Sequence, residues 1–423
     1  MEATQWWSAE ELWSWQLRQA EALLAHALDH VPYYRERLPA AGVSSTRPLT
    51  EEEWRKIPIL RRTDVHLNED ALKSATLPRG HGRVTPRRSS GSSGRPVQVG
   101  KTEASHVYWG ACSERDHIWH RRDLSGTFAF IRGQDADASY PDGQRTRGWG
   151  DTVFESGPAA WLRVDTPTAQ QAEWLQRLDP DYLLTVPVNL APLVEHCRAT
   201  DIRLPRLRGV STYGTTLHDE LRAICREVWG VSIADTYSSE EVGYIALQCP
   251  AHEHYHVQAE AVIVEILDQK GQPCPPGAPG RVIVTPLHNF ATPLLRYDIE
   301  DDAAWGEPCP CGRGLPVIRR ILGRSRDQLV LPTGERVPNV FLYDLTRDLP
   351  VSQFQVAQLA PDHLEIRLVT HGTFGVAEEG LIRARLVERL PAEFRLTVSC
   401  LDEIPRSARG KYLDFTSELP ARG

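Results

Sequence analysis

RRSSGSSGRPVQVGKT, residues 87–102, is the stretch that decides the fold of this chain. It holds four serines and three glycines. Glycine lets a backbone approach an anion closely and serine adds hydroxyl donors, so this composition predicts a loop that wraps a phosphate group. A flexible linker uses the same residue types, so the loop alone does not settle the function.

A kinase-type phosphate loop is the first alternative for this stretch. Such a loop reads G-x-x-x-x-G-K-[ST], and Gly100-Lys101-Thr102 supplies its last three positions. The position of the first glycine falls on Arg95, and Pro96 lacks a backbone donor that the loop would need. We therefore expect the serine-glycine segment 89–94, rather than 95–102, to bind phosphate.

Composition limits the class of protein. The 423 residues are 41% hydrophobic and 25% charged, which is enough for two or three globular cores. No apolar run approaches the length of a membrane helix, and the N-terminus lacks an export signal, so we expect a cytoplasmic protein with no membrane partner. The net charge of −8 and the lack of a long basic block argue against nucleic-acid binding. Eight scattered cysteines favour metal binding over a disulfide framework.

Hydrophobic periodicity predicts an α/β fold of layered sheets and helices. Ser8 and Glu11 form a capping box before an amphipathic helix over 8–31. Short β-rich runs then alternate with helical patterns, which is typical of layered α/β sheets. The expected strands are 127–131, 182–186, 262–267 and 281–287, and the expected helix is 216–229. We expect a loop over 133–160, which is rich in Gly, Asp and Arg.

The C-terminal hundred residues predict a separate small lobe. Residues 352–401 show the order strand, strand, helix, strand, which is enough for an α+β unit. We place the boundary near Gly323, giving a large domain over 1–323 and a lobe over 324–423.

Five motifs in order support a family resemblance. The segment Ser89-Ser90-Gly91-Ser92-Ser93-Gly94-Arg95-Pro96 resembles the [ST]-[ST]-G-[ST]-[ST]-G-x-P loop of the adenylate-forming superfamily, which contains acyl-CoA synthetases, adenylation domains and firefly luciferase. Segment 234–240 is similar to its Y-G-x-T-E motif and 296–301 to its Y-x-T-G-D motif. Segments 323–328 and 405–411 resemble its G-R-x-D-D hinge and its P-R-T-x-S-G-K end. CPCGR (309–313) and LLRYDIED (294–301) resemble the phenylacetate-CoA ligase and capsular-polysaccharide branch.

The resemblance implies a large N-terminal adenylate-forming domain, a small mobile C-terminal lobe, and the use of ATP and Mg²⁺. It implies that Glu240 holds Mg²⁺, that Asp301 takes the ribose hydroxyls and that Lys411 is the catalytic lysine. It implies that the aromatic ring of the Y-G-x-T-E motif packs on adenine. The residues expected to bind the nucleotide are Ser89, Ser90, Gly91, Ser92, Ser93, Gly94, Asp235, Tyr237, Ser238, Ser239, Asp301 and Arg324. Considered singly, Glu240, Asp301 and Lys411 would each be an ordinary surface charge; it is their order along the chain that favours a site.

Departures from the family pattern concern the hinge and the acyl pocket. Arg326 stands where the hinge aspartate is usual, which puts the reorientation of the lobe in question. Ser239 replaces the usual threonine and keeps its hydroxyl, whereas Thr215 replaces a glutamate common in relatives. Aromatic walls suit aryl acids, so the candidate pocket residues are Tyr108, Trp109, Tyr213 and Gly214.

Cysteines and histidines form a candidate metal site. Cys309-Pro310-Cys311 offers two close thiolates, and Cys249 with His252, His254 and His256 offers the remainder. The branch resemblance favours Cys249 and His256 with Cys309 and Cys311, a closed set typical of structural zinc. Free thiols with exposed histidines are the alternative.

Together these features predict a ligase that converts a carboxylic acid, which we expect to be aromatic, to an acyl-adenylate with release of pyrophosphate and passes the acyl group to CoA. The same chemistry could serve an amine or a carrier-protein thiol as acceptor. A non-catalytic nucleotide-binding protein is the alternative from another class, and the retained Lys411 and Glu240 argue against it. A homodimer is compatible with the sequence.

Overall fold

The computed structural model describes residues 1–44, 48–89, 96–133, 136–150, 154–324, 328–339, 345–346, 348–404 and 415–419. These residues form two compact units. The first holds the described residues up to Ile321 apart from 300–302, and the second holds 300–302 and the described residues from Leu322 onward.

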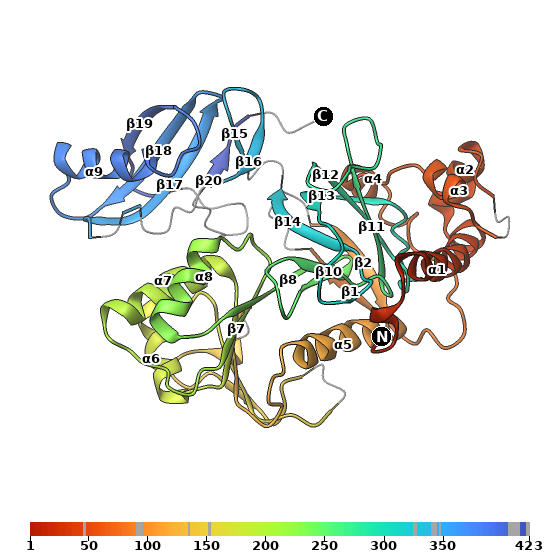
Figure 1. Ribbon diagram of the computed structural model, residues 1–423, viewed down its shortest axis with the longest axis horizontal. Coiled ribbons are helices and arrows are strands. Elements are labelled where there is room, and N and C mark those ends of the chain that lie inside the picture. The colour runs from red at the N-terminus through yellow and green to blue at the C-terminus, as the bar shows by residue number, and fades with distance from the viewer. Residues whose placement is uncertain are drawn as a thin grey trace. The chain divides into compact units, whose positions relative to one another are not determined.

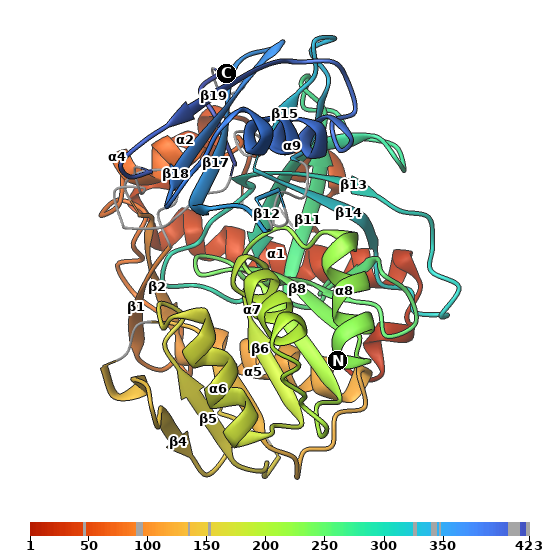
Figure 2. The same cartoon turned by 90° about the vertical axis from the view of Figure 1, so that its left-hand side faces the viewer.

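A large mixed sheet organises the first unit (Figures 1 and 2). Among the described residues it has twelve strands, in the order β11-β12-β13-β14-β10-β9-β8-β7-β6-β3-β5-β4. Strands β5, β3, β6, β7 and β8 run parallel, whereas β9 and β10 continue the sheet antiparallel. Its strands are β3 (Phe128–Ile131), β4 (Gln144–Thr146), β5 (Ala159–Leu162), β6 (Tyr182–Thr185), β7 (Gly209–Tyr213), β8 (Ile233–Ser239), β9 (Gly243–Gln248), β10 (Tyr255–Val257), β11 (Val262–Leu267), β12 (Pro279–Pro286), β13 (Tyr297–Trp305) and β14 (Val317–Arg324).

Helices cover this sheet, and a separate β-hairpin directly precedes α5 in the chain. Helices α6, α7 and α8 lie together beside the parallel strands, with α5 on the other side (Figure 1). The hairpin pairs β1 (Val84–Arg88) with β2 (Gln98–Thr102) antiparallel. The helices are α1 (Ala9–His30), α2 (Pro32–Ala40), α3 (Glu51–Lys56), α4 (Arg62–Leu67), α5 (Glu103–Trp119), α6 (Thr168–Leu178), α7 (Pro187–Ala199) and α8 (Asp219–Trp229), with short 3₁₀ turns at Thr4–Trp6 and Ala136–Ala138.

The predicted N-terminal helix is confirmed as α1. The Ser8 side chain accepts a hydrogen bond from the Glu11 backbone N–H at 3.2 Å, and the Glu11 carboxylate accepts one from the Ser8 N–H at 2.8 Å. Leucines and alanines on one face of α1 are buried in the core, because apolar residues recur there at helical spacing. The Gln16 amide donates to the Val262 carbonyl at 2.9 Å, which fixes α1 beside β11.

The second unit is a small α+β fold. Its four-stranded sheet has the order β19-β18-β17-β20, and Ile382 and Leu386 of its helix are buried in its core. The predicted order strand, strand, helix, strand over 352–401 is confirmed. The elements are β15 (Gln328–Val330), β16 (Arg336–Pro338), β17 (Val351–Ala360), β18 (His363–Thr370), α9 (Val376–Val387), β19 (Arg395–Cys400) and β20 (Phe415–Ser417).

The α/β class with a large sheet-rich unit and a small C-terminal unit is therefore confirmed. The loop expected over 133–160 is corrected, because it contains β4, the start of β5 and a 3₁₀ turn. Backbone pairing with neighbouring strands made β4 and β5, although the segment around them is rich in turn-forming residues. No helix in the described part of the chain is both long and apolar enough to cross a membrane.

Candidate active site

Ser89 closes the base of the serine-glycine loop. Its N–H donates to the Val97 carbonyl and its hydroxyl accepts from the Val97 N–H, both at 2.9 Å. The hydroxyl also accepts from the Arg62 guanidinium at 3.1 Å. Ser90, Gly91, Ser92, Ser93 and Gly94 lie outside the described residues, so their phosphate contacts stay predictions.

The residues Gly100-Lys101-Thr102 form the end of strand β2 and the start of α5. The Thr102 hydroxyl accepts from the Ser105 N–H at 3.1 Å and caps the helix. Lys101 is buried, and its ammonium donates to the Val242 carbonyl at 2.9 Å. Burial lowers the pKa of Lys101 to about 8, an effect that the nearby Glu241 carboxylate opposes. The lysine of a kinase-type loop would reach into a phosphate cradle, and this strand position argues against that alternative.

Two neighbouring glutamates follow β8 in very different surroundings. Glu240 is exposed, whereas Glu241 is buried, with only 3% of its side chain accessible to solvent. One Glu241 oxygen lies 3.5 Å from the Arg62 guanidinium and 3.5 Å from the Tyr297 hydroxyl. In the Y-G-x-T-E motif the glutamate stands four residues after the tyrosine, and four residues after Tyr237 is Glu241. The motif spacing therefore makes Glu241 a second candidate beside Glu240, and the role of each stays a prediction.

Asp235 and Tyr237 lie within β8 and are both buried. The Asp235 carboxylate accepts from the Thr212 hydroxyl at 2.6 Å and from the Tyr255 hydroxyl at 2.7 Å. Burial raises the pKa of Asp235 against the opposing effect of these hydrogen bonds. Because each carboxylate oxygen already has a protein partner, Asp235 ties β7, β8 and β10 together. The half-buried Ser238 and Ser239 end the strand, and the Ser239 hydroxyl accepts from the Val242 N–H at 3.1 Å.

Asp301 and Arg324 meet in the second unit. The Arg324 Nε lies 3.8 Å from an Asp301 oxygen, and both side chains are mostly buried. This pair joins the expected ribose-binding residue to the arginine of the hinge motif. Arg326 and Lys411 lie outside the described residues, so their roles stay predictions.

The candidate pocket aromatics face different neighbours. Tyr108 stacks on His288 with 3.4 Å between ring centroids, whereas Trp109 lies 4.5 Å from the Tyr244 ring. A Cβ on Gly243 would lie 3.7 Å from Trp109, so this indole lies beside the segment that follows Glu241. Tyr213 and Gly214 end β7, where Gly214 has a positive φ of 81°. Burial raises the pKa of Tyr213, and the charge of Arg132 opposes this effect.

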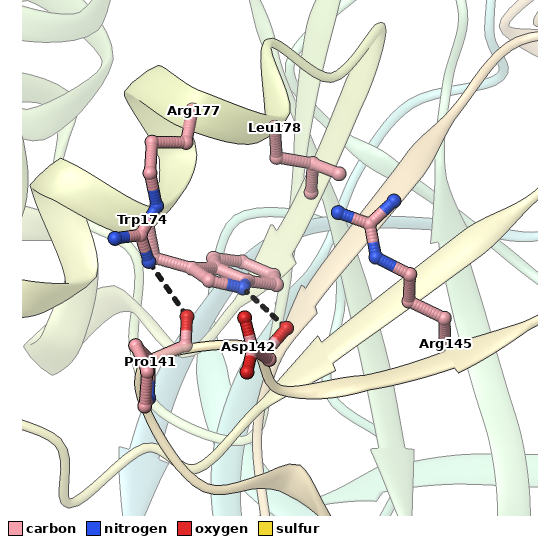
Figure 3. A pocket seen from close by; sticks show the side chains of 6 residues that line it. All are labelled: Pro141, Asp142, Arg145, Trp174, Arg177 and Leu178. Carbon is pink, nitrogen blue, oxygen red and sulfur yellow. Dashed lines mark hydrogen bonds between the residues drawn. The ribbon is translucent and has the colours of Figure 1, made fainter.

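A surface hollow lies apart from these residues (Figure 3). The Trp174 indole donates to the Asp142 carbonyl at 3.2 Å and Arg177 donates to the Pro141 carbonyl at 2.6 Å. Its empty volume, which includes space open to solvent, is about 220 Å³. It is lined by Pro141, Asp142, Arg145, Trp174, Arg177 and Leu178, none of which belongs to the predicted site.

The expected metal ligands come together. The Cys249 and Cys309 sulfurs lie 3.8 Å apart, and the Cys311 sulfur lies 3.4 Å from His256 Nε2. The group whose ligand atoms all lie within 4.8 Å of one another is Cys249, His254, His256 and Cys309, so it contains His254 in place of the expected Cys311. Two thiolates about 2.3 Å from one tetrahedral zinc would lie roughly 3.8 Å apart, so the sulfur spacing fits such an ion.

Protonation states in this Cys/His cluster also bear on metal binding. Burial lowers the pKa of His256 to about 4, which keeps the imidazole neutral, the form that binds metal. Burial raises the pKa of the Cys309 thiol to about 12 when no cation is near it. A bound cation would supply the positive charge that a thiolate at this buried position lacks.

Three residues near the loop were not singled out as site residues from the sequence, namely Arg62, Lys101 and Glu241. Two of them had a usable signal. Glu241 follows from the motif spacing, and Lys101 stands in the Gly-Lys-Thr segment that was considered for another loop. Arg62 belongs to one of several arginine pairs, and nothing local distinguishes it from the exposed Arg61.

Comparison with known proteins agrees with this architecture. Residues 329–416 match the family described as the CapK C-terminal domain. The chain is 26% identical over 386 residues to phenylacetate-coenzyme A ligase of Pseudomonas putida, covering 88% of this chain and 82% of that protein. It is 26% identical over 390 residues to the enzyme of the same name from Thermus thermophilus, covering 87% and 81%.

Solved structures share the fold. A 2-hydroxyisobutyryl-CoA ligase in the postadenylation state with 2-HIB-AMP superposes with a TM-score of 0.72 at 16% identity, covering 95% of this chain and 89% of that one. An anthranilate CoA ligase with anthranoyl-AMP gives a TM-score of 0.56 at 16% identity, covering 80% and 67%. The chain belongs to the adenylate-forming superfamily. Within it, the chain is a distant homologue of the phenylacetate-CoA ligases and an acid-CoA-ligase-like enzyme.

Proposed function

We propose that this enzyme activates a carboxylic acid with ATP as an acyl-adenylate, releases pyrophosphate and transfers the acyl group to CoA. The observation that carries the proposal is the position of Glu241, which is buried and stands four residues after Tyr237, as the Y-G-x-T-E motif requires. Its carboxylate lies near the Tyr297 hydroxyl and near Arg62, which contacts the loop base at Ser89. Homology to phenylacetate-CoA ligases supports the reaction class.

Adenylation brings two anions together, because the carboxylate must attack the α-phosphorus of a charged nucleotide. Such a step needs donors and cations aimed at the phosphates. The loop 89–94 would supply backbone N–H groups and hydroxyls. Arg62 contacts the loop base at Ser89, and both Arg62 and the buried Lys101 offset the charge of Glu241.

The glutamate pair fits a magnesium ion. Mg²⁺ is usually held by one or two carboxylates together with phosphate oxygens, and Glu240 and Glu241 offer carboxylates on adjacent residues. We assign Glu241 as the main ligand and Glu240 as the alternative. The bound ion would neutralise phosphate charge, while Asp301 would fix the ribose and Lys411 would contact the attacking carboxylate and the phosphate.

For the acid we propose an aromatic one, since Trp109 lies beside Gly243 and Tyr213 ends β7, the neighbour of the strand β8 that the glutamate pair follows. The acceptor is CoA in this proposal, with an amine or a carrier-protein thiol as the alternative. Cys249, His256, Cys309 and Cys311 would hold a structural zinc ion, with His254 as a competing ligand. A closed set of this kind leaves no position for substrate.

A panel of carboxylic acids tests the proposal. Pyrophosphate release should appear with aromatic acids when hydroxylamine is the acceptor, and a thioester should form when CoA replaces it. Aliphatic acids of similar size are the control for the pocket. A chain that binds ATP and releases no pyrophosphate with any acid would be a nucleotide-binding protein instead.

A further inference from the structure

Arg62 is a charged residue at the start of a short helix, and its side chain is nevertheless buried. It opens α4, yet only 5% of its side chain is exposed. Its Nη2 donates to the Ser89 hydroxyl at 3.1 Å, and its Nη1 lies 3.4 Å from the Tyr297 hydroxyl and 3.5 Å from Glu241. One guanidinium therefore contacts three of the family motifs, which are far apart in the sequence.

The geometry of the guanidinium explains how one residue does this. It is planar and carries five N–H donors in a fixed fork, so separate nitrogens serve separate partners. Nη2 contacts the loop base, while Nη1 contacts the carboxylate and the phenol. A lysine would place one compact charge there and would not span the same set with the same directions.

Each contact restrains a group that the reaction needs. Ser89 is fixed by Val97 and by Arg62, which sets the point where the loop leaves the β1–β2 hairpin. Glu241 is oriented by Arg62 and Tyr297, and a buried carboxylate without such partners would be strongly destabilised. Groups that orient a metal-binding carboxylate in this way usually matter for metal affinity.

We propose that Arg62 is a positioning residue for the nucleotide, which acts through Ser89 on the phosphate loop and through Glu241 on the magnesium ion. This inference rests on the proposed function for the identity of the nucleotide. It adds a residue outside the five motifs and a physical link among three of them.

Equilibrium binding of Mg-ATP tests the inference without any turnover. Titration calorimetry on the full chain, with no carboxylic acid present, should show about 10- to 100-fold weaker binding for Arg62→Gln. Arg62→Lys should recover part of this loss, because it keeps the charge and loses the fork. The matched control is Arg61→Gln, which removes the same charge from the exposed neighbouring side chain and should bind like the wild type.

A second readout separates positioning from folding. At fixed ATP, the Mg²⁺ concentration at half-saturation should rise for Arg62→Gln and stay unchanged for Arg61→Gln. If Arg62→Gln fails to fold, Ser89→Ala decides the question, because it removes only the shared hydroxyl and should weaken Mg-ATP binding roughly fivefold. If folded Arg62→Gln binds Mg-ATP with the affinity of the wild type, the inference is overturned. If Arg62→Gln does not fold, wild-type affinity in folded Ser89→Ala overturns it instead.

The two proposals fail separately in this experiment. Wild-type protein that binds Mg-ATP and never releases pyrophosphate refutes the enzymatic function and leaves the Arg62 comparison valid. Wild-type protein that releases pyrophosphate, with Arg62→Gln binding Mg-ATP equally well, refutes the role of Arg62 alone.

Discussion

Glu240 and Glu241 show how strongly the role of a side chain depends on its surroundings. They are adjacent acids in one turn, and the fold exposes the first and buries the second beside Arg62. A buried carboxylate with a cationic partner is held in one orientation, and removing it leaves that partner unpaired. We therefore expect Glu241 to contribute more than Glu240 to both chemistry and stability.

Glutamine substitution at each position should separate the two residues. Glu241→Gln should slow pyrophosphate release by on the order of 10²–10³-fold, as for the loss of one preorganised electrostatic contact. It should also lower the melting temperature, because breaking a buried ion pair costs about 3–5 kcal/mol. Glu240→Gln should leave the melting temperature unchanged and slow the reaction less. A greater loss of activity in Glu240→Gln would assign the metal to the exposed residue.

His117 makes the fold sensitive to acid. Burial, followed by the nearby Arg122 charge, lowers the pKa of His117 from 6.5 to about 4. Arg122 Nη1 lies 2.9 Å from His117 Nδ1, so the neutral ring accepts a hydrogen bond there. Because the pKa of the folded state is depressed, the stabilisation is full above pH 6.5 and is lost as the pH falls through 4.

A variant with no titrating ring checks this effect. His117→Gln keeps an acceptor for Arg122, so its melting temperature should fall less than that of the wild type between pH 7 and 4. The difference in unfolding free energy should reach at most about 3 kcal/mol, since one pKa unit corresponds to roughly 1.4 kcal/mol. Parallel melting curves for the two proteins over that range would show that His117 is not the group that titrates.

At the scale of elements, the Cys/His cluster joins three segments. Cys249 follows β9, His256 lies in β10, and Cys309 and Cys311 belong to the connection between β13 and β14. Arg313 continues this connection and lies 4.9 Å from the Trp6 ring and 4.6 Å from the Trp119 ring. The Gly314 N–H donates to the Gln5 carbonyl at 3.0 Å, so the N-terminal turn packs on the connection that carries two of the cysteines.

Metal analysis should find about one zinc ion per chain in protein purified without chelators. Removing the ion, or introducing Cys309→Ser, should lower the melting temperature and speed hydrogen exchange in residues 1–8, because the 309–314 connection holds that segment. Cys400→Ser is the matched control, since Cys400 is exposed and outside the cluster. Metal-free protein with unchanged stability and exchange would leave these residues as free thiols and imidazoles.

At the scale of the whole molecule, the candidate site residues are distributed over both units. The first holds Glu241 and the loop base, and the second holds Asp301 and Arg324. In the superfamily, the C-terminal lobe reorients between adenylation and acyl transfer. We expect the same here, with Arg326 at the hinge and Lys411 serving one step only.

Separate assays of the two half-reactions test this division. Lys411→Ala should slow adenylate formation by on the order of 10²–10³-fold and leave transfer from supplied acyl-adenylate nearly unchanged. Arg326→Pro should impair transfer more than adenylation, because a proline restricts rotation at the hinge. Equal losses in both steps for Lys411→Ala would mean that the lysine is structural or that the lobe does not alternate.

Much of this protein followed from the sequence because the relevant signals are local. The capping box at Ser8 and Glu11 is set by two residues three positions apart, and it begins α1 as predicted. The strand, strand, helix, strand order of the C-terminal unit likewise followed from short-range periodicity. Residue type and the family resemblance also singled out Cys249, His256 and Cys309, whose ligand atoms the structure brings close together, while metal binding there stays a prediction.

The tertiary structure alone decided what depends on residues distant along the chain. Arg62, Ser89, Glu241 and Tyr297 meet although up to 235 positions separate them, and His254 joins the metal cluster through the turn between β9 and β10. Short strands at 144–146 and 159–162 likewise exist because neighbouring strands supply their backbone partners. Burial gives a charged side chain its partners, and burial is a property of the folded chain, which is why only the tertiary structure distinguishes the exposed Glu240 from the buried Glu241.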